Sequence, residues 1–171
     1  WTSEPTLRRL GGYETLLDRC KDDAYVSETR RKDEERTQRW HRELNGRDSG
    51  LQEGWFRAEC DESGWETFEV PGSWRGTHLE SFRGSVWIRK NVELPPDAAE
   101  GEALLKLGTI VDADETYING TLVGTTGYRY PPRRYRIPPS VLKPGVNTIA
   151  VRVVSTHNPL ELVEDMPYEL V

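Results

Sequence analysis

Gly108-Thr-Ile-Val-Asp-Ala-Asp-Glu-Thr-Tyr-Ile-Asn-Gly-Thr-Leu-Val-Gly124 is the stretch that decides the fold of this 171-residue chain. It reads as two short strands joined by Asn119-Gly120. Asn-Gly is the strongest short-range hairpin signal, because both central residues of a type I′ turn need a positive φ. Residues 115–118, just before the turn, alternate in polarity. The stretch therefore predicts antiparallel β-structure in the middle of the chain.

Short strand-like runs separated by Pro- and Gly-rich turns surround this hairpin from residue 55 onward. In the last long run Ile149, Val151 and Val153 alternate with residues of the opposite face. A single helical turn is expected at 139–142. Many short strands with turn signals between them predict a mainly β domain over residues 51–165, an antiparallel jelly-roll or galactose-binding-like β-sandwich. Its expected strands are residues 67–70, 85–94, 103–107, 115–118, 121–123, 134–137 and 147–154.

Residues 1–50 differ in composition from the rest of the chain and predict an N-terminal helical arm. Between residues 13 and 44 there is no proline or glycine and charge is dense. An apolar face begins at residues 16, 17, 20 and 24, then fades. Asn45-Gly46 supplies a C-terminal stop. A helix this polar buries little within its own domain, so it is expected to bridge solvent or to pack on a neighbouring domain.

The charge distribution excludes several classes of function. Residues 1–50 are neutral, with 11 basic and 11 acidic residues, and residues 51–171 carry 12 against 18, which gives the net charge of −6. A nucleic-acid partner has no electrostatic support, and no apolar run approaches the roughly 20 residues that a membrane span needs. Cys20 and Cys60 have no metal-type spacing and are either free thiols or one disulfide. We expect no cofactor and no metal site.

Catalytic machinery is not recognisable in the sequence. A serine hydrolase needs a nucleophile on a tight turn, a histidine base and an orienting acid, and no Gly-x-Ser-x-Gly occurs. Ser73 and Ser85 are interpreted as turn and strand-entry residues. Histidines 41, 78 and 157 are scattered and more typical of surface or packing residues than of bases. We therefore expect no catalytic residue in this chain.

The acidic cluster around Asp112 and Asp114 is the first candidate ligand site. Adjacent acids can bind Ca²⁺ or polarise a sugar hydroxyl, but no Ca²⁺-loop spacing such as Asp-x-Asp-x-Asp-Gly is present. The alternative, which we favour, is that the two acids share a strand face and pair with arginine or with backbone near a turn.

Aromatic residues provide the second candidate. Exposed aromatic rings stack on sugars, yet tryptophan also fills the core of a β-sandwich, and this is our expectation for Trp65, Trp74 and Trp87. Tyr128 and Tyr130 lie with Arg129 in a Gly/Pro-rich loop, where ligand contacts are more common. We predict that this loop, together with the two acids, forms any ligand-binding surface.

Several motifs follow one another in a fixed order along the chain. They are Asp61-Glu-Ser-Gly-Trp65, Val70-Pro-Gly-Ser-Trp74, Gly84-Ser-Val-Trp-Ile-Arg-Lys90, Leu107-Gly-Thr-Ile-Val-Asp-Ala-Asp114, Tyr117-Ile-Asn-Gly120, Arg134-Tyr-Arg-Ile-Pro138 and Asn147-Thr-Ile-Ala-Val-Arg152. This ordered set resembles the sugar-binding jelly roll of glycoside hydrolase family 2 and, more closely, the β-domain inserted in sialate O-acetylesterases, which are SGNH-type carbohydrate esterases. The opening Trp1-Thr-Ser-Glu and the run Asp165-Met-Pro-Tyr-Glu-Leu170 resemble the segments that flank that insertion.

The resemblance implies a non-catalytic insertion domain of a sialate O-acetylesterase that frames the active site or positions the sugar. Its partners would be a flanking SGNH-type esterase domain and acetylated glycans, and residues 166–171 would return toward the esterase. It implies a parent that could be secreted or periplasmic. The family's Gly-x-Ser-Asn and Asp-x-x-His motifs are absent, since Thr156-His-Asn-Pro159 lacks the aspartate. The alternatives are a sugar-binding domain of a family 2 glycoside hydrolase and a free carbohydrate-binding module.

Overall fold

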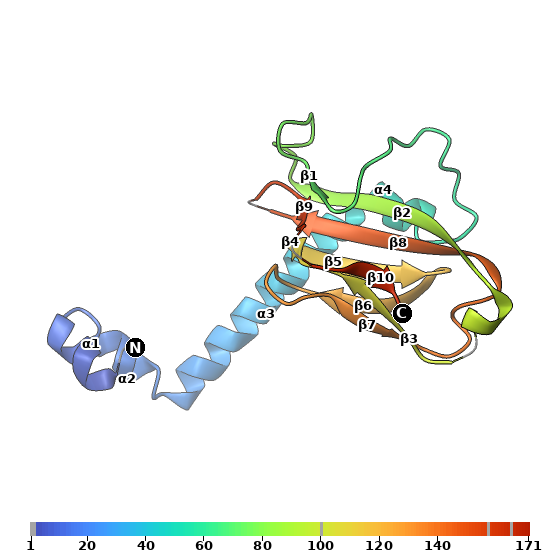
Figure 1. Ribbon diagram of the computed structural model, residues 1–171. Coiled ribbons are helices and arrows are strands. Elements are labelled where there is room, and N and C mark those ends of the chain that lie inside the picture. The colour runs from blue at the N-terminus through green and yellow to red at the C-terminus, as the bar shows by residue number, and fades with distance from the viewer. Residues whose placement is uncertain (1–2, 100, 157, 165) are drawn as a thin grey trace. The chain divides into compact units, whose positions relative to one another are not determined.

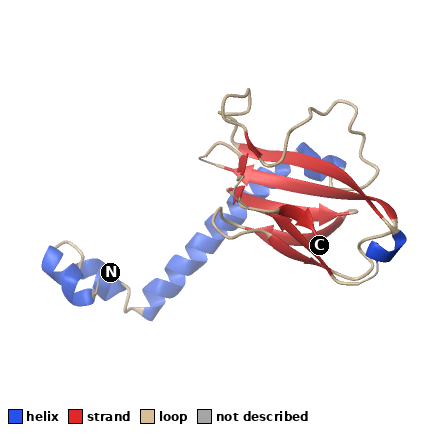
Figure 2. Ribbon diagram, viewed as in Figure 1, coloured by secondary structure: helices blue, strands red, loops and turns tan. Residues whose placement is uncertain are grey.

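The computed structural model describes residues 3–99, 101–156, 158–164 and 166–171. The chain divides into two compact units, Trp1–Arg47 and Asp48–Val171. The boundary falls slightly before the predicted one at residue 50, because Asp48 caps the first helix of the second unit. Figures 1 and 2 show the helices of the first unit and the strands of the second.

The first unit contains α1 (Glu4–Leu10), α2 (Glu14–Arg19) and α3 (Asp23–Gly46). The helical segment expected between residues 13 and 44 is present, but it is not continuous, because the chain leaves the helix between α2 and α3. The carboxylate of Asp22 accepts hydrogen bonds from the backbone N–H groups of Ala24 and Tyr25, so it starts a new helix. The predicted stop is confirmed, because α3 ends at Gly46. No residue of α3 is buried within this unit.

The second unit is an antiparallel β-sandwich, which confirms the predicted fold class. One sheet has the order β2-β8-β5-β6 and a second has the order β10-β3-β7, while β1, β9 and β4 form a small third sheet. The helical elements are α4 (Ser49–Glu53) and a 3₁₀ turn (Pro96–Ala99). The strands are β1 (Gly72–Ser73), β2 (Gly84–Leu94), β3 (Ala103–Leu107), β4 (Ile110–Val111), β5 (Ala113–Ile118), β6 (Thr121–Thr126), β7 (Arg134–Ile137), β8 (Gly145–Ser155), β9 (Glu161–Leu162) and β10 (Tyr168–Leu170).

The predicted hairpin is present between β5 and β6. Asn119 and Gly120 have φ values of 50° and 86°, as a type I′ turn requires. The Asn119 side chain donates to the carbonyl of Val141 and to Asn147 Oδ1, and it accepts from the backbone N–H of Thr148. These contacts hold the turn against the start of β8.

The core lies between the sheets and is built on β8, one of the two inner strands of the four-stranded sheet. Its residues Ile149, Val151 and Val153 face inward, as their alternation predicted. Leu105 and Ile137 pack on them from the opposite sheet. Burying each such aliphatic side chain contributes about 1.5–3 kcal/mol relative to exposure.

The aromatic predictions are confirmed in part. Trp74 and Trp87 are buried, and Phe68 stacks on Trp74 with 4.0 Å between ring centroids. Trp65 is only half-buried, in edge contact with Trp55.

Two local predictions are wrong. Residues 67–70 form no strand, and pairing begins instead at β1, because Pro71 has no N–H to donate to a ladder. The helical turn expected at 139–142 is a non-helical turn, since Ser140 has a φ of 73°, outside the right-handed helical region.

Of the predicted return strand 166–171, Tyr168–Leu170 pair within this unit, because β10 lies antiparallel to β3. Their continuation toward a flanking domain stays a prediction. The two cysteines are free thiols, the first of the two possibilities left open by the sequence. Within the described residues, no helix has the length and apolar character needed to span a membrane.

Candidate functional site

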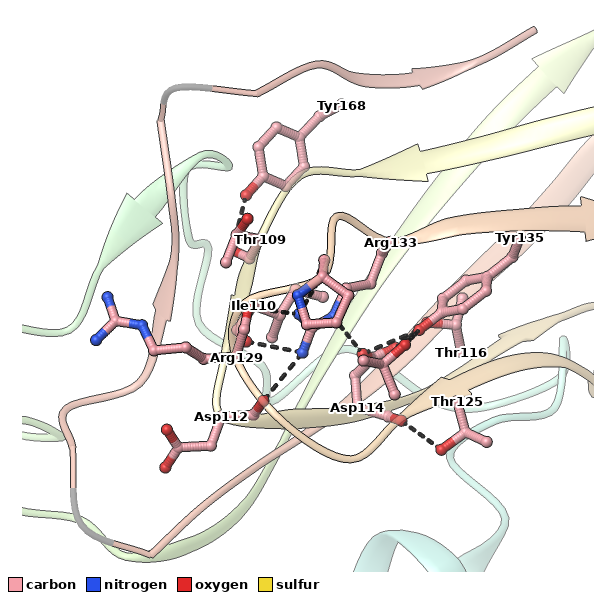
Figure 3. A network of polar contacts seen from close by, with 12 residues as sticks. Thr109, Ile110, Asp112, Asp114, Thr116, Thr125, Arg129, Arg133, Tyr135 and Tyr168 are labelled. Atoms are coloured by element: carbon pink, nitrogen blue, oxygen red, sulfur yellow. Dashed lines mark hydrogen bonds and ion pairs between the residues drawn. The ribbon is translucent and has the colours of Figure 1, made fainter. Parts of the chain in front are cut away.

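The acidic stretch after β4 contains Asp114, which forms a buried ion pair with Arg133 (Figure 3). Asp114, in β5, turns its carboxylate into the sandwich, where Oδ1 accepts a hydrogen bond from Arg133 Nε at 2.7 Å. Both side chains have no exposed surface. Thr116 Oγ1 donates to Asp114 Oδ2 at 2.8 Å. Burial raises the pKa of the Asp114 carboxyl, against the hydrogen bonds from Arg133, Thr116 and Tyr135, which lower it.

Arg133 uses its remaining N–H groups to join two loops. Nη1 donates to the carbonyls of Arg129 and Pro131, both at 2.8 Å. Nη2 donates to the carbonyls of Ile110 and Asp112, at 2.8 and 3.0 Å. All five donors of the guanidinium are therefore occupied. The side chain fixes the β6–β7 loop against the segment that connects β4 and β5.

Tyr135, in β7, closes this network from the opposite sheet. Its hydroxyl lies 2.8 Å from Asp114 Oδ2 and 2.8 Å from Thr126 Oγ1. Burial, followed by the nearby Asp114 charge, raises the pKa of Tyr135, so the phenol stays protonated. A Cβ on Gly124 would lie 2.0 Å from the Tyr135 ring, so only glycine leaves room for it there.

The carboxylate of the second predicted acid, Asp112, does not take part in the hydrogen-bond network of Asp114, Arg133 and Tyr135. Its carboxylate accepts hydrogen bonds from Ser155 Oγ at 2.9 Å and from Asn158 Nδ2 at 3.0 Å. Both acids thus contact Arg133, Asp112 through its backbone carbonyl and Asp114 through its carboxylate. The expected pairing with arginine holds for the Asp114 carboxylate, but the expectation that the two acids share a strand face is wrong, because Asp112 precedes β5 and its carboxylate is held by Ser155 and Asn158. A direct contact of either acid with a ligand stays a prediction.

The predicted aromatic pair lies at the surface of the loop that Arg133 holds. Tyr128 and Tyr130 are 61% and 75% exposed. The Arg129 guanidinium lies 5.6 Å from the centroid of the Tyr130 ring, a cation–π distance. The loop therefore presents two tyrosine rings to solvent, with the half-buried Arg129 between them, while its backbone is anchored by Arg133.

A small hollow adjoins the base of this loop. It encloses about 180 Å³, including space open to solvent, and it lies where β3, β7 and the chain before β10 meet. Its enclosed free space is only about 10 Å³, roughly the room that one water molecule needs, so the hollow is not a ligand pocket. It is lined by Lys106, Gly108, Pro132, Arg133, Arg134, Met166 and Pro167.

A second buried polar cluster, on the outer face of the four-stranded sheet, was not predicted. Asp48 Oδ2 accepts hydrogen bonds from Arg152 Nε and Ser85 Oγ, both at 2.6 Å, and Oδ1 accepts from Trp87 Nε1 at 2.9 Å. Arg152 Nη1 also donates to Glu115 Oε1 at 3.2 Å. An arginine between apolar residues in β8 was the sequence signal for a buried ion pair, although its partner could not be read from it.

The pKa of Asp48 lies below its usual value. Burial alone would raise it, but the hydrogen bonds from Ser85, Trp87 and Arg152 and the Arg152 charge together outweigh that effect. The carboxylate is therefore charged at neutral pH and ties the start of α4 to the sheet.

Arg89 anchors the segment that follows α4 on the same face. Its Nε donates to Glu62 Oε1 at 2.6 Å, and its terminal nitrogens donate to the carbonyls of Trp55, Arg57 and Ala58. The outer face of β2, β8 and β5 is thus covered by residues 48–62 of the same unit.

The serines considered as nucleophiles have structural contacts instead. Ser73 Oγ accepts from the backbone N–H of Arg75, and Ser85 Oγ donates to Asp48. His41 contacts Trp40, His78 lies 3.9 Å from Glu66, and His157 is outside the described residues. Among the described residues, no group of three or more His, Cys, Asp and Glu side chains is placed to hold a metal ion.

No protein-family model matches the chain, and no curated protein matches it. Solved structures do. A calcium-binding mutant of Bacteroides uniformis β-glucuronidase 2 is 25% identical over 65% of this chain, with a TM-score of 0.56. Ruminococcus gnavus β-glucuronidase in complex with C6-substituted uronic isofagomine is 25% identical over 64%, with a TM-score of 0.53. Bifidobacterium dentium β-glucuronidase complexed with coumarin-3-O-glucuronide is 25% identical over 58%, with a TM-score of 0.51.

The chain spans only 15%, 19% and 16% of these three proteins. The likeness is therefore to one domain of a much longer enzyme. It supports the resemblance to the sugar-binding jelly roll of glycoside hydrolase family 2, and it lends no support to the esterase resemblance.

Proposed function

We propose that this chain acts as a non-catalytic, sugar-binding jelly-roll domain of a larger carbohydrate-active hydrolase of the glycoside hydrolase family 2 type. The likeness to a single domain of several β-glucuronidases is the observation that carries the proposal. The internal contacts of Ser73, Ser85 and Asp114 support it, because these groups serve the fold.

The ligand surface in this proposal is the β6–β7 loop with Tyr128, Arg129 and Tyr130. Sugar rings stack on exposed tyrosine faces, and a loop whose backbone is already fixed loses little entropy when a ligand binds. Arg133 supplies that fixation through the carbonyls of Arg129 and Pro131. Asp112 and Asp114 support the loop indirectly, because both accept hydrogen bonds from Arg133.

The test combines binding with turnover on the 171-residue chain. We expect calorimetry or NMR titration with methyl β-D-glucoside and methyl β-D-glucuronide to detect binding of at least one of the two. We expect no hydrolysis of 4-nitrophenyl β-D-glucuronide or 4-nitrophenyl acetate. Turnover that one substitution abolishes would overturn the non-catalytic role, and absence of any saccharide binding would overturn the sugar-binding role.

A second candidate is an insertion domain of a sialate O-acetylesterase, which the motif order and the segment Asp165–Leu170 favour. In that case the partners are an SGNH-type esterase domain and acetylated glycans. Sequence extended in both directions separates the two: a serine block upstream favours the esterase, and an immunoglobulin-like domain followed by a barrel downstream favours the glycosidase. A free carbohydrate-binding module would have neither.

A further inference from the structure

We propose that α3 pairs with α3 of a second copy of this chain as an antiparallel, two-stranded coiled coil. The helix is 24 residues long and none of its side chains is buried. It contains six acidic and six basic residues, so two copies meet without net repulsion. This inference goes beyond the proposed sugar-binding function and does not depend on it.

One face of α3 has the spacing of a coiled-coil seam. Six positions recur at alternating intervals of four and three residues, over about 27 Å of helix. The apolar members are Val26 and Leu44, which are half-buried, and Trp40, which is 39% exposed. An exposed tryptophan on a charged helix is typical of an interface anchor. The seam consists of Val26, Arg30, Asp33, Thr37, Trp40 and Leu44.

The seam is complementary to its own reversed copy. In an antiparallel pair with a two-fold axis near residue 35, the facing residues are Val26 with Leu44, Arg30 with Trp40, and Asp33 with Thr37. The axis repeats each contact. The pairs join two aliphatic side chains, a cation with an indole ring, and a carboxylate with a hydroxyl donor. A parallel pair would place Arg30 against Arg30 and Asp33 against Asp33, so the charges select the antiparallel direction.

The ion pairs within α3 leave the seam arginine available. Arg31, outside the seam, pairs with Glu28 and Glu35. In the described part of the chain, no carboxylate forms an ion pair with Arg30. Its guanidinium can therefore lie on the ring of Trp40 in the second copy, and tryptophan is the best aromatic partner for a cation.

Two flanking residues limit the affinity. Glu34 and Arg36 lie on opposite sides of the seam next to the two-fold axis, so each would face its own copy across it. Like charges in this position oppose association. Half of the seam is also polar, so we expect a weak dimer, with a dissociation constant on the order of 100 µM. Well below that concentration the chain is a monomer and α3 stays exposed.

Sedimentation equilibrium of the full chain tests the association. We expect a monomer at about 5 µM and mostly dimer at about 1 mM, as mass action requires for that dissociation constant. Trp40→Ala should weaken the dimer at least about tenfold without loss of helical circular dichroism. Tyr25→Ala, at an exposed aromatic residue outside the seam, should leave it unchanged. A chain that stays monomeric at about 1 mM would overturn the second copy as the occupant of this face, in favour of a neighbouring domain.

Glu34→Gln supplies a gain of association that misfolding cannot imitate. It removes the like-charge contact at the two-fold axis, so the dimer should tighten at least about twofold. Glu35→Gln is the matched control, because the next residue lies on the outer face of the helix and should not tighten the dimer. Equal dissociation constants for the two variants would overturn the antiparallel pairing.

Disulfide trapping tests the direction and the register. Cys20 and Cys60 are free thiols, so both are first replaced by serine. Val26→Cys combined with Leu44→Cys, oxidised with copper phenanthroline, should then give a covalent dimer whose bonds join residue 26 of one copy to residue 44 of the other. Within one chain these positions lie about 27 Å apart, too far for a disulfide. Links that join residue 26 to residue 26 would overturn the proposal in favour of a parallel pair.

Discussion

Arg133 donates a hydrogen bond through Nε to Asp114 Oδ1 over 2.7 Å, with neither side chain exposed to solvent. This pair unites the two features that stand out in the sequence, the acidic run before the hairpin and the arginine-rich loop after it. The acid lies inside the sandwich, and the exposed part of the loop faces solvent. The buried Asp114–Arg133 pair therefore supports the fold, and the exposed residues of the β6–β7 loop form the candidate ligand surface.

Asp114→Asn should destabilise the chain strongly. The substitution keeps the size of the side chain but leaves the Arg133 charge buried without its counter-charge, which typically costs about 3–5 kcal/mol. Urea denaturation at pH 7 measures the change in the free energy of unfolding. Arg136→Met, at an exposed position of β7, is the control and should change it by less than about 0.5 kcal/mol. A loss below about 1 kcal/mol for Asp114→Asn would mean that the pair is not needed for the fold.

Gly50→Ala should detach the start of the segment that covers the four-stranded sheet. A Cβ at residue 50 would lie 2.2 Å from Trp87 Nε1, the atom that donates to Asp48. Overpacking of this kind typically costs about 1–3 kcal/mol. Gly64→Ala is the matched control, because nothing lies within 4 Å of a Cβ there. Equal unfolding midpoints of the two variants in urea would contradict the tight packing of α4 on Trp87.

The hairpin and the inward face of β8 could be predicted from the sequence because their signals are local. Asn119-Gly120 has one favoured geometry, and the alternation of Ile149, Val151 and Val153 has the period of a strand. The pairs β1–β9 and β4–β9 could not be predicted, since strands of two residues have no measurable period.

The polar clusters could be predicted only in part, for a related reason. An aspartate paired with an arginine was expected near the hairpin, but nothing in the sequence selects Arg133 over its neighbour Arg134. Only the fold turns one inward and the other outward. Asp48 and Arg152 are 104 residues apart, and their contact depends on tertiary structure. Propensity and spacing carry no information on such a pair.

Asp48→Asn should reveal a pH-dependent part of the stability. The pKa of Asp48 is lower in the folded chain than its usual value of 3.8. The charged form is thus favoured by folding, and the stabilisation is present above about pH 4 and lost as the pH falls through the folded pKa. The wild type should therefore exceed the variant in stability at pH 7, and the difference should narrow at pH 3. Urea denaturation of both proteins at the two pH values measures it, and a difference that grows toward low pH would contradict the assigned charge state.

The long helix α3 should exchange its amide hydrogens much faster than β8. None of its side chains is buried, and its ion pairs, such as Arg31 with Glu28 and Glu35, are exposed. Hydrogen bonds from Arg31 and then Lys32 lower the pKa of Glu28 to about 2, but exposed pairs contribute little to stability. In β8, Ile149 to Ser155 are all buried and the strand is paired on both sides, so its amides should open only when the whole sandwich unfolds. Hydrogen exchange followed by mass spectrometry on the full chain measures both segments together. Protection of residues 23–46 equal to that of 145–155 would mean that the arm is held by contacts beyond those of its own unit, as expected for a helix that packs on a neighbouring domain or on a second copy of the chain.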